Sequence, residues 1–296
     1  MLKIAQIGIV VGALFLISTG SSVENRSNLI RRPQDSLQKD KPDPLKPDFI
    51  KVPLQEWEKP FTEFQYRVLK YSGHVLPYRL YTPPGMVAGK SYPLLIFMHG
   101  AGERGIDNRR QFFRFAPFKF WLKYPCYVLA PECPKQEDEG ANGNGVWVNT
   151  PFGASKHEMK EIPTWPMKLA ITVIDSLLRE KNIDKRRVYV TGLSMGGFAT
   201  WELLQRKPSV FAAAMPVCGG GDLAYASKIA KVPLWIFHGD ADSTVPVARS
   251  RDMVSAIKAV RGKPRYTEYP NVGHDAWTPT YPKEEVWDWL FGQRQK

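Results

Sequence analysis

The residues best suited to chemistry in this sequence are a serine, an aspartate and a histidine that follow one another along the chain. Ser194 lies in Gly-Leu-Ser-Met-Gly, residues 192–196, directly after a run of β-branched and aromatic residues that predicts a buried strand. A serine between glycines at a strand-to-helix turn is exposed for attack, because the glycines leave room for a strained backbone. The pattern therefore predicts Ser194 as a nucleophile.

A serine hydroxyl needs a base to take its proton, and that base needs an acid to fix its tautomer. After such a turn the usual chain order is serine, then Asp or Glu, then histidine. Only His238 and His274 follow Ser194. His238 closes a predicted strand, and Asp222 is the only plausible acid between it and Ser194. We therefore predict His274 as the base.

Two aspartates compete for the role of the acid. Asp240 and Asp242 both follow the predicted strand that ends at His238. Asp242 lies farther past the strand, in the turn before the next helix, which favours it, whereas Asp240 is interpreted as a turn-forming side chain. Asp222 and Asp275 stay open as weaker alternatives.

Acyl transfer also needs two fixed N–H donors for the developing oxyanion. One is predicted at Met195, the residue after the nucleophile. The other is predicted at Ala101, in His-Gly-Ala-Gly, residues 99–102, which follows the predicted central strand 92–98. A glycine turn without a catalytic role would explain the glycines of this loop, but not why the loop follows the central strand together with the other candidate catalytic segments.

The elements that must position these residues alternate between strand and helix from about residue 62. Strands are predicted at 64–71, 76–81, 92–98, 127–130, 188–193, 211–217, 233–237 and 265–269. Helices are predicted at 165–181, 198–206, 247–260 and 284–291, and in part of 109–124. This order predicts an α/β fold with a mostly parallel sheet covered on both faces. Ligands bind beyond the carboxyl ends of such strands, where every candidate residue lies.

The N-terminal residues have a different composition. Residues 1–20 hold Lys3, an apolar run over 4–17 and then small residues, which predicts a signal peptide and a secreted or periplasmic protein. An uncleaved N-terminal anchor is the alternative. Residues 21–61 repeat proline among mixed charges and predict a disordered linker. The catalytic domain is predicted over 62–296, with no stable membrane insertion after the signal is removed.

The formal net charge of +12 would suit an anionic partner. Basic residues do not interleave with aromatic ones in a recognisable nucleic-acid-binding module, so we expect no nucleic acid. Residues 104–123 hold six Lys and Arg residues against Asp107 alone. This segment is interpreted as a solvated basic face, and the competing hypothesis is attraction of anionic polymers such as uronate-bearing plant polysaccharide.

The cysteines and histidines give no pattern for a metal. Three cysteines, Cys126, Cys133 and Cys218, leave at least one unpaired. Cys133 and Cys218 both follow predicted strands, so a disulfide between them is open, but buried free thiols are preferred. The histidines are scattered, no cysteine pair has ligand spacing, and phosphate-binding and dinucleotide-binding fingerprints are missing, so no metal or cofactor is expected.

Five segments taken in chain order resemble the α/β-hydrolase superfamily. They are HGAGERG (99–105), GLSMGG (192–197), PVCGGGD (216–222), HGDADSTVPV (238–247) and NVGHDAW (271–277). They are most similar to a branch of secreted esterases and predicted peptidases, related to feruloyl and acetylxylan esterases and to dienelactone hydrolases. The resemblance covers about residues 62–294.

The resemblance implies an α/β-hydrolase fold, a triad of Ser194, Asp242 and His274, and an oxyanion hole formed by Ala101 and Met195. The oxyanion loop is not the HGGG type of many lipases, which argues against bulky tertiary-alcohol esters. We therefore expect a secreted serine hydrolase that cleaves carboxylic esters through an acyl-enzyme. Its expected substrates are small esters or acylated plant polysaccharide.

Two alternatives to an esterase stay open. A serine peptidase of the prolyl-oligopeptidase type would need a gating domain, which the residues before 62 cannot form. A catalytically silent binding protein on the same scaffold is the other, and the intact Ser, Asp and His argue against it. The sequence gives no oligomeric state.

Overall fold

The computed structural model describes residues 48–51, 63–111, 114, 118–135, 146–180 and 182–296. The chain divides into two units, residues 1–41 and 42–296, and every described residue belongs to the second. The predicted signal peptide lies outside the described residues, as does the predicted linker apart from 48–51.

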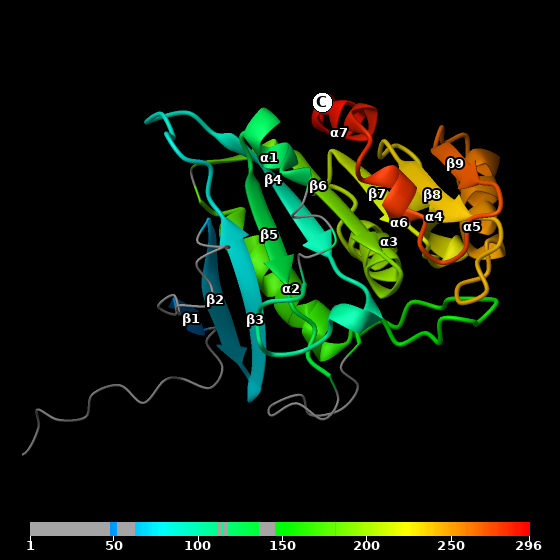
Figure 1. The fold of residues 1–296 in the computed structure, drawn as a ribbon, viewed down its shortest axis with the longest axis horizontal. Helices are drawn as coiled ribbons and strands as arrows, with labels where there is room; N and C mark the ends of the chain where they lie inside the picture. The colour runs from blue at the N-terminus through cyan, green and yellow to red at the C-terminus, as the bar shows by residue number, and fades with distance from the viewer. Residues whose placement is uncertain (1–47, 52–62, 112–113, 115–117, 136–145, 181) are drawn as a thin grey trace, which may run out of the picture. The chain divides into compact units, whose positions relative to one another are not determined.

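The strands of the second unit join in one sheet of nine, in the order β1-β2-β3-β5-β4-β6-β7-β8-β9 (Figure 1). Their bounds are Asp48–Lys51 (β1), Phe64–Tyr71 (β2), His74–Tyr81 (β3), Tyr92–Met98 (β4), Tyr127–Pro131 (β5), Ile183–Leu193 (β6), Ala213–Val217 (β7), Trp235–Gly239 (β8) and Arg265–Tyr269 (β9). β1, β2, β3 and β5 pair antiparallel in turn, and the pairs from β5 to β9 are parallel. The predicted α/β fold with a mostly parallel sheet is confirmed.

Helices cover both faces of the sheet. They are α1 (Phe120–Lys123), α2 (Trp165–Leu177), α3 (Met195–Arg206), α4 (Ala226–Ile229), α5 (Ala248–Ala259), α6 (Trp277–Thr280) and α7 (Glu284–Phe291), with short 3₁₀ turns η2 (Ala101–Glu103) and η4 (Leu223–Tyr225). Residues of α2, α3, α4 and α5 pack into one apolar core, and residues of α1 and α7 pack into a second. Thr164 caps α2 as predicted, because its side chain accepts the N–H of Met167.

The centre of the sheet fixes the edge at which the candidate residues lie. All seven residues of β4 are buried, as expected for a strand covered on both faces. β4 lies beside β6 in parallel, and Met98 pairs with Gly192 at their carboxyl ends. The arrowheads of β4, β5 and β6 point the same way in Figure 1. The loops after these strands therefore leave the sheet at one edge.

One part of the predicted linker is in the sheet. Asp48–Lys51 form β1, which pairs antiparallel with β2 over four residues, Ile50 opposite Val68 among them. The domain boundary at residue 62 is therefore wrong, because it leaves out an edge strand. A strand of four residues among prolines and charges has too short an alternation to be recognised from the sequence.

The helix predicted within 109–124 covers only Phe120–Lys123, and parts of the segment lie outside the described residues. Before it, Asn108 takes a left-handed φ of 56° and is buried. Its Nδ2 donates to the carbonyls of Arg67 and Tyr78, at 3.3 and 3.1 Å. These contacts join residues far apart in sequence, so local pattern cannot indicate them.

Other predicted boundaries differ by a few residues. The helix predicted to residue 181 ends at Leu177, because the chain must return to begin β6, whose Ile183 pairs with Tyr92. The three cysteines are buried and free, so the preferred state is confirmed. The described residues contain no helix with the length and apolar character needed to cross a membrane.

Candidate active site

Ser194 occupies a strained turn between β6 and α3. Its φ is 55° and its ψ is −120°, a conformation that a residue with a side chain rarely adopts and that costs about 1–3 kcal/mol. The Ser194 N–H donates to the carbonyl of Val217 at 3.0 Å, which fixes the turn against β7. The serine is 6% exposed, so its hydroxyl lies at a nearly closed surface.

Two glycines after the serine allow α3 to approach the sheet. A Cβ on Gly196 would lie 1.9 Å from the carbonyl oxygen of Met98, and one on Gly197 would lie 2.3 Å from that of Val217. Both neighbours are backbone atoms and cannot turn aside. The absence of a side chain at both positions therefore lets the serine turn pack directly against β4 and β7, as the pattern predicts.

The three predicted side chains form one hydrogen-bonded row. His274 Nε2 lies 2.8 Å from Ser194 Oγ, and His274 Nδ1 lies 2.7 Å from Asp242 Oδ2. Because a carboxylate only accepts, Nδ1 carries the proton and Nε2 is left to accept from the hydroxyl. The residues come from the loops after β6, β8 and β9, which meet at the carboxyl edge of the sheet.

The acid in this row is held in place by backbone donors. Asp242 Oδ1 accepts the N–H groups of Thr244 and Val245 at 2.9 and 2.8 Å. Burial raises the pKa of the Asp242 carboxyl, but hydrogen bonds from His238, His274 and Val245 outweigh it and hold that pKa well below its ordinary range. The Asp242 carboxyl is therefore ionised at neutral pH and can accept the proton on His274 Nδ1 in a hydrogen bond.

The other aspartates have local roles. Asp240 Oδ1 accepts the N–H of Asn271 at 2.7 Å and so joins two loops, in line with its interpretation as a turn-forming side chain. Asp222 accepts the N–H of Ala224 at 3.0 Å and caps η4. The aspartate that His274 contacts is Asp242, the residue that the sequence favours.

The two predicted oxyanion donors begin helices on neighbouring strands. Ala101 is the first residue of η2 after β4, and Met195 is the first residue of α3 after β6. The N–H group of a first helical residue has no partner within its helix, so it is available to a ligand. Both residues lie at the carboxyl edge of the sheet, where β4 and β6 end side by side.

His99 fixes the loop that carries Ala101. Its Nδ1 donates to the Gly100 carbonyl at 2.6 Å and its Nε2 accepts the Cys133 N–H at 2.8 Å. Burial lowers the pKa of His99 to about 4, so the ring is neutral and can act as donor and acceptor at once. The Arg104 Nε donates to the Ala101 carbonyl at 3.0 Å and holds the same loop from the other side.

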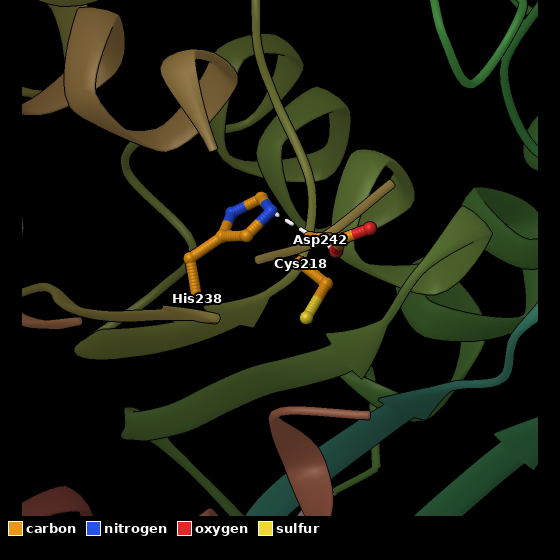
Figure 2. A group of neighbouring side chains, drawn as sticks. All are labelled: Cys218, His238 and Asp242. Atoms are coloured by element: carbon orange, nitrogen blue, oxygen red, sulfur yellow. Dashed lines mark ion pairs between the residues drawn. The ribbon is translucent and has the colours of Figure 1, made fainter. Parts of the chain in front are cut away.

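His238 is a functional residue that the sequence argument considered only as a base. It lies beside Asp242 (Figure 2). Its Nε2 lies 3.2 Å from Asp242 Oδ2 and 3.0 Å from the Val245 carbonyl, while Nδ1 lies 2.7 Å from Ser250 Oγ. Because both partners of Nε2 only accept, that nitrogen carries a proton. The spacing of four residues between His238 and Asp242, directly after a strand, is the signal that could have indicated this contact.

Figure 2 also shows Cys218 next to this pair, and one ligand atom from each of the three residues lies within 4.8 Å of the others. The chemistry of these groups does not suit a metal. Burial, and then the charge of Asp242, raise the pKa of the Cys218 thiol, so it stays protonated. Nε2 of His238 holds a proton against two acceptors. The cluster is better explained as hydrogen-bonded support for Asp242.

Comparison with known proteins identifies a family of hydrolases. The family model described as phospholipase/carboxylesterase matches residues 87–281. The chain is 26% identical over 218 residues to poly(3-hydroxyalkanoate) depolymerase C of Paucimonas lemoignei, a match that covers 62% of this chain and 48% of the depolymerase. It is 38% identical over 74 residues to a bifunctional acetylxylan esterase/xylanase of Neocallimastix patriciarum, covering 25% of this chain and 11% of that one.

Two solved structures share the fold of this chain. A thermostable esterase superposes with a TM-score of 0.70 at 38% identity, over 79% of this chain and 64% of the esterase. An acylaminoacyl peptidase of Pyrococcus horikoshii superposes with a TM-score of 0.59 at 17% identity, over 83% of this chain and 45% of the peptidase, which shows the fold alone. The chain spans about half the length of the depolymerase and a smaller share of the xylanase.

Proposed function

Since the chain belongs to the phospholipase/carboxylesterase family, we propose that it is a serine hydrolase that cleaves carboxylic esters through an acyl-enzyme. The observation that carries the proposal is the row of Ser194, His274 and Asp242, with contacts of 2.8 and 2.7 Å. The carboxylate beside Nδ1 of His274 assigns the proton to that nitrogen. A hydroxyl beside an unprotonated imidazole nitrogen is the arrangement that a serine nucleophile needs.

In this mechanism Ser194 Oγ attacks the ester carbonyl while His274 Nε2 takes its proton. Asp242 keeps the imidazole oriented and stabilises the imidazolium. The N–H groups of Ala101 and Met195 hold the oxyanion of the tetrahedral intermediate. The imidazolium then protonates the leaving alcohol, and the acyl group stays on Ser194. Water attacks the acyl carbon with His274 again as the base, the bond to Ser194 Oγ breaks, and the imidazolium returns its proton to that oxygen as the carboxylic acid leaves.

The first prediction tests the nucleophile. Ser194→Ala removes the attacking oxygen and should lower kcat on a short acyl nitrophenyl ester by about 10⁴-fold or more, because the remaining groups cannot form an acyl-enzyme. The melting temperature should stay close to that of the wild type, and a fluorophosphonate probe should label the wild type only. Turnover retained by the variant would contradict the mechanism. Failure of the probe to label the wild type would favour a silent binding protein.

For the substrate, we propose esters carried by plant polysaccharide in addition to small esters. Support comes from the acetylxylan esterase activity named for one relative. The purified protein should release acetate or ferulate from acylated xylan faster than it cleaves an amide of the same acyl group. An amide that is cleaved faster than its matched ester would overturn this choice and favour a peptidase.

We also propose that the protein is exported, on the basis of its first twenty residues alone. The full chain expressed in a bacterial host should appear outside the cytoplasm and lack those residues by mass spectrometry. Retention in the cytoplasm would reject export, and full-length protein in the membrane fraction would favour an uncleaved anchor.

A further inference from the structure

A basic hollow of about 780 Å³ lies on the surface of the second unit, away from Ser194 and its partners. We define it by the cations that line it: Lys228, Lys231, Arg261, Lys263, Arg294 and Lys296. All six are exposed, and the described residues of its lining include no aspartate or glutamate. The charged side chains of the hollow are therefore all of one sign and line a concave surface.

The hollow lies at the opposite edge of the sheet from Ser194. Ala212 and Pro233 line it directly before β7 and shortly before β8, and Lys263 lies before β9. These are the amino ends of parallel strands, whereas Ser194, Asp242 and His274 follow the carboxyl ends. In Figure 1 the mark C, near which the last residues of the hollow lie, is on the side away from the arrowheads of β4 and β5. A ligand in the hollow would leave the row of Ser194 open.

Among the residues that the structure describes, four of these six cations have no acidic partner. Arg294 pairs with Asp184 at 3.3 Å, and the ammonium of Lys228 lies over the ring of Tyr225. The other four, which are Lys231, Arg261, Lys263 and Lys296, form no ion pair with any residue that the structure describes. Like charges grouped in this way repel one another, and a bound anion would relieve that repulsion.

The basic segment near the oxyanion loop differs in this respect. Arg114 pairs with Glu103 at 3.1 Å, and Lys123 forms ion pairs with Glu284 and Asp288. Those cations are partly neutralised by the protein itself. The hollow is thus the better candidate for an anionic partner.

We propose that the basic hollow binds an anionic polysaccharide that carries carboxylate groups, such as a polyuronate. A concave surface suits a chain better than a flat bilayer, and guanidinium groups match carboxylates in charge and shape. Among the described lining residues the aromatic one is Phe211, which is 2% exposed, so these residues offer no ring on which a nucleic acid base could stack. A second copy would bring equal charges together. Only the choice of a sugar polymer rests on the proposed function.

Such binding would hold the protein on an anionic polymer while Ser194, at the other edge, acts on esters within reach. The effect is one of local concentration, because a bound enzyme meets nearby esters more often than a free one. Affinity should fall as salt rises, since the contacts are exposed and carry full charges.

The experiment measures binding of the full chain to polygalacturonate by calorimetry at low ionic strength, with neutral arabinoxylan as the comparison polymer. Arg261→Gln with Lys263→Gln removes two charges from the hollow. The matched control is Arg179→Gln with Lys70→Gln, two exposed cations elsewhere on the unit. We expect affinity about tenfold lower for the hollow variant and within about twofold of the wild type for the control.

Ester hydrolysis is measured separately from polymer binding, so that the proposed function and the proposed binding site are tested independently. Ser194→Ala should bind polygalacturonate as the wild type does, and the hollow variant should cleave a small neutral ester at the wild-type rate. Equal affinities of the hollow and control variants, or equal binding to the neutral polymer, would overturn the proposal. Tighter binding to a DNA oligonucleotide or to anionic phospholipid vesicles than to polygalacturonate would reject the polysaccharide as the partner.

Discussion

Among single residues, Asp242 is held in place through both of its carboxylate oxygens. Backbone N–H groups hold one carboxylate oxygen, and the other lies between His274 and His238. An acid with this many donors cannot rotate, so the imidazole of His274 has a single preferred orientation. Preorganisation of this kind removes the need to order the groups during the reaction.

This leads to a prediction for His238 as a positioning residue. His238→Gln keeps an N–H donor near the place of Nε2, whereas His238→Asn places its amide near Nδ1 and leaves Asp242 with one donor fewer. We expect kcat to fall about tenfold in the Asn variant with little change in KM, and the Gln variant to recover most of the loss. Equal loss in both variants, with a matched drop in melting temperature, would indicate a purely structural role.

Two buried histidines make stability depend on pH. Burial lowers the pKa of His99 and of His157 to about 4 from an unfolded value of 6.5. Between these values the unfolded chain binds more protons than the folded one, so acid favours unfolding. The stability that the neutral rings provide is complete above about pH 6.5 and is lost as pH falls toward 4.

We therefore expect the free energy of unfolding, measured with urea, to fall between about pH 6.5 and 4. Each histidine should contribute about 3 kcal/mol or less over that range. His157→Gln should make the decline shallower, because one of the two proton-binding groups is gone. A slope that the substitution leaves unchanged would show that His157 does not titrate differently on folding.

At the scale of elements, the contact of α3 with β4 and β7 sets the position of the nucleophile. The Cβ atom of Gly197→Ala would meet the Val217 carbonyl, so the helix must shift or the turn must open. Such a clash with backbone should cost about 3 kcal/mol or more and lower the melting temperature by about 10 °C, with a large loss of activity. Gly153→Ala is the control, because nothing lies within 4 Å of a Cβ there. A variant at 197 as stable as the one at 153 would contradict this account.

The secondary-structure elements differ in how well the sequence alone predicts them. Continuous apolar runs such as β4 and the serine turn after β6 are local patterns, and the structure agrees with both. β1 and the turn at Asn108 depend on partners far away in the chain, so no local window contains their cause. The contact of His238 with Asp242 is not predicted from the sequence for a related reason. From the sequence His238 is a candidate only as a base for Ser194, whereas in the structure its Nε2 contacts the acid, Asp242.

At the scale of the molecule, charge and chemistry lie at different edges of one sheet. The formal net charge of +12 does not by itself indicate a partner, but six of the cations gather in the basic hollow. Hydrolysis of a small neutral ester should then be insensitive to ionic strength. Hydrolysis of an ester on an anionic polymer should slow as salt rises from about 0.01 to 0.5 M. Equal salt dependence for the two substrates would contradict electrostatic capture of the polymer.

The three cysteines have a practical consequence. All are free and buried, and burial raises the thiol pKa of Cys126 and of Cys218. A thiol reagent therefore reacts only with molecules that have opened. Its rate of labelling gives the frequency of that opening without added dye or engineered probe, and a reducing buffer is needed whenever the protein is unfolded and refolded.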